Sequence, residues 1–482
     1  MADATSDSRV LGVLGYCSLA FYCTLATFFW TSWSSSTTGA DEAIVFIAGI
    51  TLAGLYFYGL TCARRARTAV IVIFAIAFGL VGFLILPFDS TDVFFYMATG
   101  WQQAHYHNNP YSGLLRDVEG MANDPIIDAE SMARNKNPWQ DLPLPYGFLF
   151  ALVSRVIAWL GRGSFWATLA WFNALNLAMH AGIALLLWKS AKFIPLGNPK
   201  VVLYLYSWNP FVVLQYLANV HNDILVAFLV VLAAYCLLSG RSLWTLPILA
   251  ASALVKYVTA ALIPFAFIFL LRNRGWPAAI RSVLLATAVT ILSALPYLRE
   301  VTGFRYKLIL AQLSESTGSL HAFILYSYRM LTGLWPFLLG SMPEFRLATQ
   351  VVLWLIFGIF AVRELHASWS ERSIEPLLMI QRWTSILFAI IFVASSQFFA
   401  WYIGMLFPLA LLTDRKSTLA DTVILLSGTH MLSFTFLRRK AIGYFVLATL
   451  VPIIYMAVVS SRRKATARAL PSAVTTFSHF IH

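Results

Sequence analysis

The chain has 482 residues, of which 59% are hydrophobic and only 11% are charged, and its mean hydropathy is +0.73. This composition excludes an ordinary soluble domain, in which about 25% of residues are charged. A net charge of +13 would suggest nucleic acid in a soluble protein, but the Lys and Arg residues fall largely in short loops beside apolar segments, where the positive-inside rule expects them. We therefore predict a polytopic membrane protein without a nucleic-acid partner. The fold should be all-α, because backbone groups in lipid must be satisfied internally and the segments are too long for barrel strands.

Apolar segments close to the roughly 17 to 25 residues that cross a bilayer as a helix recur along the chain. They predict about fourteen transmembrane helices in a single integral membrane domain over 1–482, with both termini inside. The first segment exceeds a signal-peptide h-region, so we expect it to be retained. The expected spans are 11–33, 43–62, 69–87, 165–188, 201–217, 223–239, 243–255, 259–271, 276–298, 346–363, 382–397, 399–413, 419–437 and 441–459.

Basic loops give the orientation of these spans. The arginines of 64–67 mark the inside, and the lysines of 189–200 follow on the same side after an even number of crossings. Arg438 to Lys440 fall outside in this scheme, so either the last two spans are misplaced or the cluster holds a lipid headgroup. The same parity requires that the apolar stretch 321–340 does not cross fully, and we expect a re-entrant or surface helix there.

One long polar segment interrupts the first half of the chain, from Phe88 to about Pro145. It has about sixty residues, and loops of that length are usually functional or disordered. Repeated proline turn signals favour an ordered path of short helices and turns. We expect an outer loop over 88–164 with interfacial helices, one of them over 146–161. Its carboxylates, which outnumber its bases, are Asp89, Asp92, Asp117, Glu119, Asp124, Asp128, Glu130 and Asp141.

Asp89 and Asp92 stand where the third apolar span meets this loop, and charges at such a boundary are candidates for function. If the segment is helical, the i, i+3 spacing places both carboxylates on one face. Two carboxylates that close can raise one pKa, which suits a general base. Because Asp89-Ser90-Thr91-Asp92 also looks like a helix start, capping by one aspartate is an alternative that is compatible with catalysis.

Polar residues also interrupt the apolar middle of the chain. Asn209-Pro210 lies inside the span 201–217, where proline usually kinks or breaks a helix. His221-Asn222-Asp223 opens the next span, and a helix entering lipid rarely starts with ionisable residues unless it borders water or a cavity. We predict that Asn209, Asn222 and Asp223 bind substrate, with helix capping by Asn222 or Asp223 as the alternative.

Lys256 divides the apolar run 243–271 into two short helices. An amine in apolar surroundings must reach water or find an anion. We predict that it binds a phosphate, with an ion pair to Asp223 as the alternative. His221 and Arg305 could contact the same phosphate, although a solvated loop charge is the simpler interpretation of Arg305.

Aromatic residues gather near the expected membrane interfaces, and the aromatic belt explains most of the 16 tryptophans. A few aromatic rings can instead bind a sugar, because a flat ring covers the apolar face of a sugar while a phenol keeps a polar tip. We predict this role for Tyr96, Tyr146 and Tyr402. The four cysteines lie in or beside apolar runs, and His105 and His107 do not share a helix face, so neither a metal nor another cofactor is expected.

Taken in order, several short motifs resemble one family. They are Ser90-Thr91-Asp92-Val93-Phe94-Phe95-Tyr96, Gly100, Asn109-Pro110-Tyr111, Pro145-Tyr146-Gly147, Trp208-Asn209-Pro210 and His221-Asn222-Asp223. The ordered set is similar to that of the polyprenyl-phosphate-mannose-dependent α-1,6-mannosyltransferases of bacterial envelopes, which belong to the GT-C class of membrane glycosyltransferases. The chain departs from the pattern at Phe94-Phe95, where a more polar pair is common, and at Gly147-Phe148, where Gly-Pro is usual.

This resemblance implies that the protein transfers a sugar, with mannose as the favoured one, from a polyprenyl-phosphate donor to a glycan or lipoglycan acceptor. It also implies that the transfer inverts the configuration at the anomeric carbon. It implies an active site on the outer face of a bacterial inner membrane, with Asp92 at the catalytic position and Asp89 without a firm counterpart. The residues agree, because a carboxylate facing water can deprotonate an acceptor hydroxyl and a cation such as Lys256 can stabilise the leaving phosphate. The alternative is a transporter or flippase of lipid-linked sugars, although the chain shows no internal repeat of the kind common in transporters.

Overall fold

A computed structural model of the chain describes residues 2–33, 39–120, 124–126, 141–194, 197–308, 315–334, 342–413, 417–434, 443 and 445–469. These described residues are almost entirely helical. They contain no β-strand, only an isolated bridge at which Thr317 and Gly318 meet Gln397. The structure therefore confirms the all-α membrane class that the composition predicted.

Helices carry the label α, and short 3-10 or π turns carry the label η. The first half of the chain forms α1 (Ala2–Thr31), α2 (Gly39–Ala63), α3 (Thr68–Leu84), α4 (Asp92–Ala104), η1 (Leu115–Asp117), α6 (Phe148–Gly161), α7 (Phe165–Ser190), η3 (Ala191–Phe193), α8 (Pro199–Ser207), α9 (Pro210–Val212), η4 (Val213–Ala218), α10 (Asp223–Leu238), η5 (Ser242–Trp244) and α11 (Thr245–Ala253). The second half forms η6 (Tyr257–Leu262), α12 (Ile263–Arg274), α13 (Trp276–Ala294), η7 (Leu295–Gly303), α15 (Leu320–Leu334), α16 (Met342–Ser370), α17 (Pro376–Ala389), η9 (Ile390–Ala394), η10 (Ala400–Tyr402), α18 (Ile403–Ala410), α19 (Thr418–Thr429), η11 (His430–Phe434), η13 (Val446–Leu450) and α21 (Val451–Ala469).

A helix lies within every range that the hydropathy predicted as a span. Within the described chain, 7 helices are long and apolar enough to cross a membrane, and the bent pair from α8 to η4 makes up to 8. Other apolar helices, among them α3, α10 and α11, are shorter than this. By length, the structure thus supports about half of the fourteen predicted crossings. The other predicted spans coincide with helices that are shorter than this.

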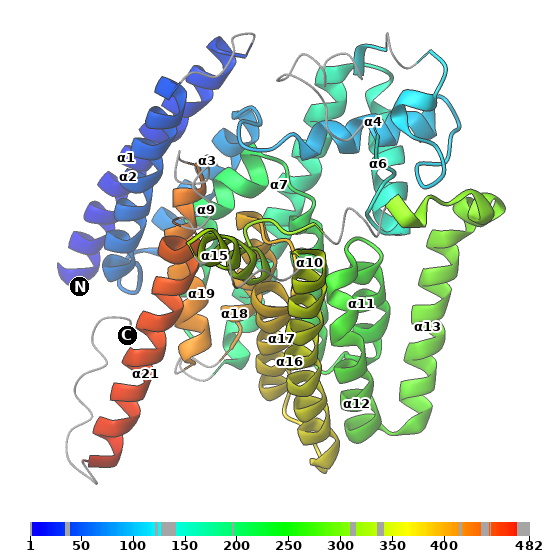
Figure 1. Cartoon of the computed structure of the whole chain (residues 1–482). Helices are drawn as coiled ribbons and strands as arrows, with labels where there is room; N and C mark the ends of the chain where they lie inside the picture. Colours follow the sequence, from blue (N-terminus) through cyan, green and yellow to red (C-terminus); the bar gives the residue numbers. More distant parts are fainter. Residues whose placement is uncertain are drawn as a thin grey trace.

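The helices form one bundle around α10, which packs against α7, α11, α17 and α18 (Figure 1). Figure 1 shows the segment around α4 and α6 at one end of the molecule and the turn between α12 and α13 at the other. The acidic loop and this basic turn therefore lie at opposite ends, as the charge pattern predicted.

Basic loops that were predicted to share one side of the membrane are neighbours in the structure. Lys200 Nζ donates to the Ala66 carbonyl at 3.1 Å, which joins the start of α8 to the turn after α2. Arg274 donates to the Gly240 carbonyl at 3.2 Å, which joins the turn after α12 to the turn after α10. The exception that sequence analysis noted, Arg438 to Lys440, lies outside the described residues.

Both predicted helix breaks are present, and both flank α10 in the chain. At Asn209-Pro210 the chain bends by 44° between α8 and the α9–η4 helix, because Pro210 cannot donate a backbone hydrogen bond. The second break separates α11 from η6 and leaves Lys256 in extended backbone. Chain breaks of this kind bring polar groups into the apolar interior, where they need partners.

The described segment that begins at residue 315 contains α15, which has 15 residues and is not among the helices long enough to cross a membrane. In Figure 1, α15 runs across the bundle near one end of α16. This agrees with the prediction that the stretch 321–340 does not cross fully, although 335–340 lie outside the described residues.

Candidate active site

Asp92 is the first residue of α4, whereas Asp89 precedes the helix in irregular backbone. The predicted shared helix face of the two aspartates is therefore wrong. The capping prediction is also wrong, because the N-cap residue is Thr91 and it makes no side-chain cap hydrogen bond. Asp89 is held by Asn219 Oδ1, which accepts its backbone N–H at 2.9 Å, and by Gln215, whose amide nitrogen donates to its carboxylate at 3.5 Å.

The Asp92 carboxylate forms part of a polar cluster built from segments far apart in the chain. Its Oδ2 lies 3.6 Å from His221 Nδ1 and accepts a hydrogen bond from the Tyr96 hydroxyl at 3.4 Å. The Tyr96 hydroxyl lies 3.3 Å from the Tyr146 hydroxyl. Since the Asp92 side chain remains 15% exposed, a substrate can reach the carboxylate.

Burial alone would raise the pKa of Asp92, but the contact with His221 and the charge of Lys256 outweigh burial and lower this pKa below its ordinary value. Asp92 is therefore ionised at neutral pH. Burial raises the pKa of the Tyr96 and Tyr146 hydroxyls well above their ordinary value, so both phenols stay protonated. An ionised carboxylate beside two neutral donors has the protonation state that a general base requires.

Lys256 lies in an ion pair with Asp223, with 2.7 Å between Nζ and Oδ1. The Lys256 amine also lies 4.0 Å from the centre of the Tyr402 ring, within the range of a cation–π interaction. Asp223 is 1% exposed and Lys256 is 17% exposed, so the cation is the more accessible partner. The ion pair that sequence analysis gave as an alternative is thus present, and the phosphate role of Lys256 stays a prediction.

Several polar atoms of the cluster are buried and have no hydrogen-bond partner within the described part of the chain. They are Nε2 of His221, both amide atoms of Asn222 and Oδ2 of Asp223, whereas Nδ1 of His221 lies 3.6 Å from the Asp92 carboxylate. Asn222 occupies the N-cap position of α10 but makes no side-chain cap bond, so capping does not explain its side chain. Buried polar atoms nearly always have partners, so these atoms are candidates for contacts with a ligand.

The backbone before this motif is strained. Val220 has φ +56°, and a β-branched residue is a rare occupant of the left-handed region. Such strain persists only where the surroundings hold it, and it is often found at functional sites. Asn176 provides part of that support, because its Nδ2 donates to the carbonyls of Tyr216 at 2.8 Å and His221 at 3.2 Å.

Trp401 belongs to the cluster, although a tryptophan near an expected membrane interface would ordinarily be assigned to the aromatic belt. Its ring is stacked on the His221 ring, with 4.0 Å between centroids and 16° between planes. Asn219 and Gln215, which hold Asp89, were also missed. Their signal was available, since each is an amide inside an otherwise apolar run, where a polar side chain needs a partner.

The start of α6 fixes Tyr146 against the broken helix that contains Lys256. The Gly147 N–H donates to the Val255 carbonyl at 3.2 Å and the Leu149 N–H donates to the Leu254 carbonyl at 3.0 Å. The free amides of one helix start therefore satisfy the free carbonyls of one helix end. Gly147 is required at this contact, because a Cβ there would lie 2.2 Å from the Leu254 carbonyl oxygen.

Two predicted site residues have other surroundings. The Arg305 guanidinium donates to the Ser112 carbonyl at 2.8 Å and to Asp117 at 3.0 Å, so its contacts within the described chain are with the outer loop and not with the Asp92 cluster. The Asn209 side chain is fully buried, caps α9 by accepting from the Phe211 N–H at 2.9 Å, and donates to Ser427 at 2.9 Å. Neither placement supports a contact with substrate.

Apart from Asp89, the remaining predicted residues do meet in one place. Asp92 can accept a proton, Lys256 can face a negative charge, and Tyr96 and Tyr146 can donate hydrogen bonds. The described residues contain no group of three or more His, Cys, Asp or Glu side chains that could hold a metal ion. The chemistry that these side chains themselves offer is acid–base and electrostatic.

The fold and this cluster define a helical membrane protein in which largely buried ionisable side chains gather around Asp92 and Lys256. Residues 10–272 match the family model described as alpha-(1→6)-mannopyranosyltransferase, N-terminal domain, and the chain belongs to this family. The matched region contains every member of the cluster except Trp401 and Tyr402.

Among curated proteins, the alpha-(1→6)-mannopyranosyltransferase A of Mycobacterium tuberculosis is 26% identical over 216 residues. The match covers 43% of this chain and 39% of the relative, so less than half of either chain is compared. No solved structure matches the chain. The family is thus shown through the N-terminal half.

Proposed function

We propose that the protein transfers mannose from a polyprenyl-phosphate donor to a hydroxyl of a glycan or lipoglycan acceptor, with inversion at the anomeric carbon. The observation that carries the proposal is the cluster around Asp92. There, a partly exposed carboxylate lies near buried polar atoms, His221 Nε2 and side-chain atoms of Asn222 and Asp223, that have no hydrogen-bond partner among the described residues. A sugar, with hydroxyl groups on every side, is the class of ligand that such atoms suit. Membership of the mannosyltransferase family supports mannose.

The reaction follows from the proposed positions. The acceptor O–H gives its proton to an Asp92 oxygen while the acceptor oxygen forms a bond to the anomeric carbon. The bond between that carbon and the phosphate oxygen breaks on the opposite side, and its electron pair leaves with the lipid phosphate. The phosphate is already a stable anion, so a cation near the developing charge replaces a general acid.

Lys256 is the proposed cation. Its amine is held 2.7 Å from Asp223, and the Tyr402 ring covers one side. An arriving phosphate would share the amine with Asp223, since an ammonium group has three donors. His221, which lies between the Asp92 carboxylate and the Trp401 ring, would fix the position of the base and contact the same phosphate.

The cellular setting is part of the proposal. We place the site on the outer face of a bacterial inner membrane, because the acidic loop lies opposite the basic turn of α12 and α13. A GT-C-like fold with about fourteen crossings, in which the shorter apolar helices also cross, fits the predicted spans. The proposed reaction uses no metal and no other cofactor, since Asp92 and Lys256 supply the base and the charge.

A donor comparison tests the proposal. The purified full chain in lipid nanodiscs is given polyprenyl-phosphate mannose, polyprenyl-phosphate glucose, polyprenyl-phosphate arabinose or a nucleotide-linked mannose, with an α-1,6-mannan acceptor. We expect a new mannosyl linkage only with the mannose lipid, and nuclear magnetic resonance of the product gives its configuration. Transfer from the nucleotide donor would refute the lipid donor, and movement of lipid-linked sugar across the bilayer without transfer would favour a flippase.

A further inference from the structure

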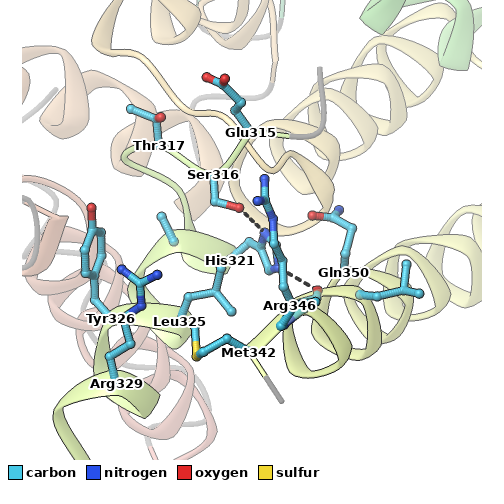
Figure 2. Close-up of a pocket in the computed structure, with 13 residues that line it drawn as sticks. Glu315, Ser316, Thr317, His321, Leu325, Tyr326, Arg329, Met342, Arg346 and Gln350 are labelled. Carbon is cyan, nitrogen blue, oxygen red and sulfur yellow. Dashed lines mark hydrogen bonds between the residues drawn. The ribbon is translucent and has the colours of Figure 1, made fainter. Parts of the chain in front are cut away.

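A second feature, outside the Asp92 cluster, is a pocket of about 690 Å³ between α15, the start of α16 and the segment 315–317 (Figure 2). We call it the arginine pocket, after Arg329 of α15 and Arg346 of α16, which line it. Its volume lies within the range of pockets that hold small ligands. None of its residues lies within the region that matches the family model.

The polar groups of the arginine pocket favour an anion. Two guanidinium groups and one carboxylate line the pocket, and Figure 2 shows that the carboxylate, that of Glu315, is turned toward the outside. Guanidinium groups bind phosphate strongly because their N–H donors match its oxygens in pairs. Gln350, at the end of the pocket, donates to the Ala394 carbonyl at 2.9 Å, and its buried Oε1 has no partner among the described residues.

The remaining wall is apolar and continues onto an exposed apolar face of α16. Leu325 and Met342 line the pocket, together with Leu347. Leu347 is 67% exposed, and the exposed Val351 and Leu355 follow at i+4 and i+8 on the same face of α16. An anionic headgroup in the pocket would therefore have an apolar groove wall and then a helix face along which a hydrocarbon chain can lie.

The pocket is also joined to the Asp92 cluster through backbone contacts. Thr317 N–H donates to the Ser396 carbonyl at 3.1 Å, and Phe398 N–H donates to the Thr317 carbonyl at 2.8 Å. The segment that begins with Ser396 continues to Trp401 and Tyr402, whose rings contact His221 and Lys256. The segment from Ser396 to Tyr402 thus connects the arginine pocket to the Asp92 cluster.

We propose that the arginine pocket binds the phosphate of a polyprenyl-phosphate lipid, with the isoprenoid chain along the exposed face of α16, as a docking site distinct from the catalytic position beside Lys256. This inference rests on the proposed function, since it gives the lipid of the donor a path between the bilayer and the cluster. Charge complementarity and the continuous apolar face favour this ligand over a water-soluble anion.

Binding to the full chain in phosphatidylcholine nanodiscs tests the site. Polyprenyl phosphate is titrated against wild type, the double variant Arg329→Gln with Arg346→Gln, and the matched control Arg363→Gln, which removes an exposed arginine from the same helix. We expect the double variant to bind about tenfold more weakly and to show a donor KM raised by a similar factor at unchanged kcat, with no effect of the control. The variant Arg329→Lys with Arg346→Lys, which keeps the charge, should recover part of the affinity and shows that the fold is intact.

Competition identifies the ligand. Polyprenyl phosphate should displace phosphatidylglycerol and inorganic phosphate from the pocket, whereas equal binding of phosphatidylglycerol or inorganic phosphate would overturn the assignment. Unchanged polyprenyl-phosphate affinity in the double variant would overturn it as well. Binding that depends on both arginines, in a wild type that transfers no mannose, would instead refute the proposed function and leave the docking site standing.

Discussion

The Asp92 cluster and the arginine pocket handle charge in different ways. In the Asp92 cluster, Lys256 Nζ lies 2.7 Å from Asp223, and the carboxylate of Asp92, the proposed base, lies among buried polar atoms. In the arginine pocket, two guanidinium groups and one carboxylate line an open cavity beside an exposed helix face. The first arrangement suits proton transfer and recognition of a polar sugar, and the second suits capture of an anionic lipid. Chemistry and lipid binding would thus be separate tasks of separate regions.

The substitution Asp92→Asn should have the largest effect of the changes considered, because it should abolish most of the transfer while leaving lipid binding intact. It keeps the shape of the side chain and removes the base, so we expect a loss in kcat of about 10² to 10⁴, with polyprenyl-phosphate binding unchanged. Single-turnover mannose transfer measures the loss, and titration of the lipid measures the binding. Asp89→Asn is the matched control, because Asp89 lies outside α4 and outside the hydrogen-bonded group around Asp92. Wild-type turnover in Asp92→Asn would remove this residue from the mechanism.

The ion pair of the cluster should respond differently from the arginines of the pocket. Removing one partner of a buried pair leaves the other charge uncompensated, which typically costs about 3 to 5 kcal/mol. We therefore expect Lys256→Ala and Asp223→Asn each to lower the midpoint of thermal unfolding, and Lys256→Ala to weaken donor binding as well. The combined variant should lose less stability than the sum of the two changes. Additive losses would mean that the two side chains are not coupled.

The composition of the cluster could be predicted from the sequence for one physical reason. Lys256, His221 and Asp223 are ionisable groups beside apolar runs, and such groups need partners or water. The helix break at Lys256 was predicted from the same property, and the break at Pro210 was predicted because proline interrupts a helix. It could not choose among partners, so the ion pair of Lys256 remained one of two alternatives until the three-dimensional arrangement was known.

Other features could not be predicted, because the sequence signal has more than one physical cause. Asn209 is polar inside an apolar run, but the cause is a helix cap, which gives the same pattern as a binding residue. Trp401 at an expected interface resembles a belt residue, and its stacking on His221 depends on long-range packing. Hydropathy also cannot detect the 3-10 and π turns that shorten several apolar helices below the length of a span.

The junction between α6 and α11 tests whether the cluster can be displaced while the pocket stays intact. In Gly147→Ala the new Cβ would lie 2.2 Å from the Leu254 carbonyl oxygen, so the chain must shift, at a cost of about 1 to 3 kcal/mol. We expect a lower midpoint of thermal unfolding and slower transfer, with polyprenyl-phosphate binding preserved. Gly54→Ala is the control, since nothing lies within 4 Å of a Cβ at that position of α2. Equal stability of the two variants would show that the contact is not close.

The pH dependence of transfer should show the smallest effect, and its sign can be worked out. The contact with His221 and the charge of Lys256 keep the pKa of Asp92 below its ordinary value despite burial. The active form is the carboxylate, so transfer by wild type is lost only as the pH falls through this lowered pKa. His221→Gln removes the largest contribution that lowers the pKa, so the acidic limb of kcat/KM should move to higher pH. Binding of polyprenyl phosphate to the arginine pocket at pH 7 should not change, because the arginines of the pocket stay charged at that pH. An acidic limb that stays in place would mean that His221 does not lower the pKa of Asp92, and would leave the Trp401 stacking and the proposed phosphate contact as its contributions to the cluster.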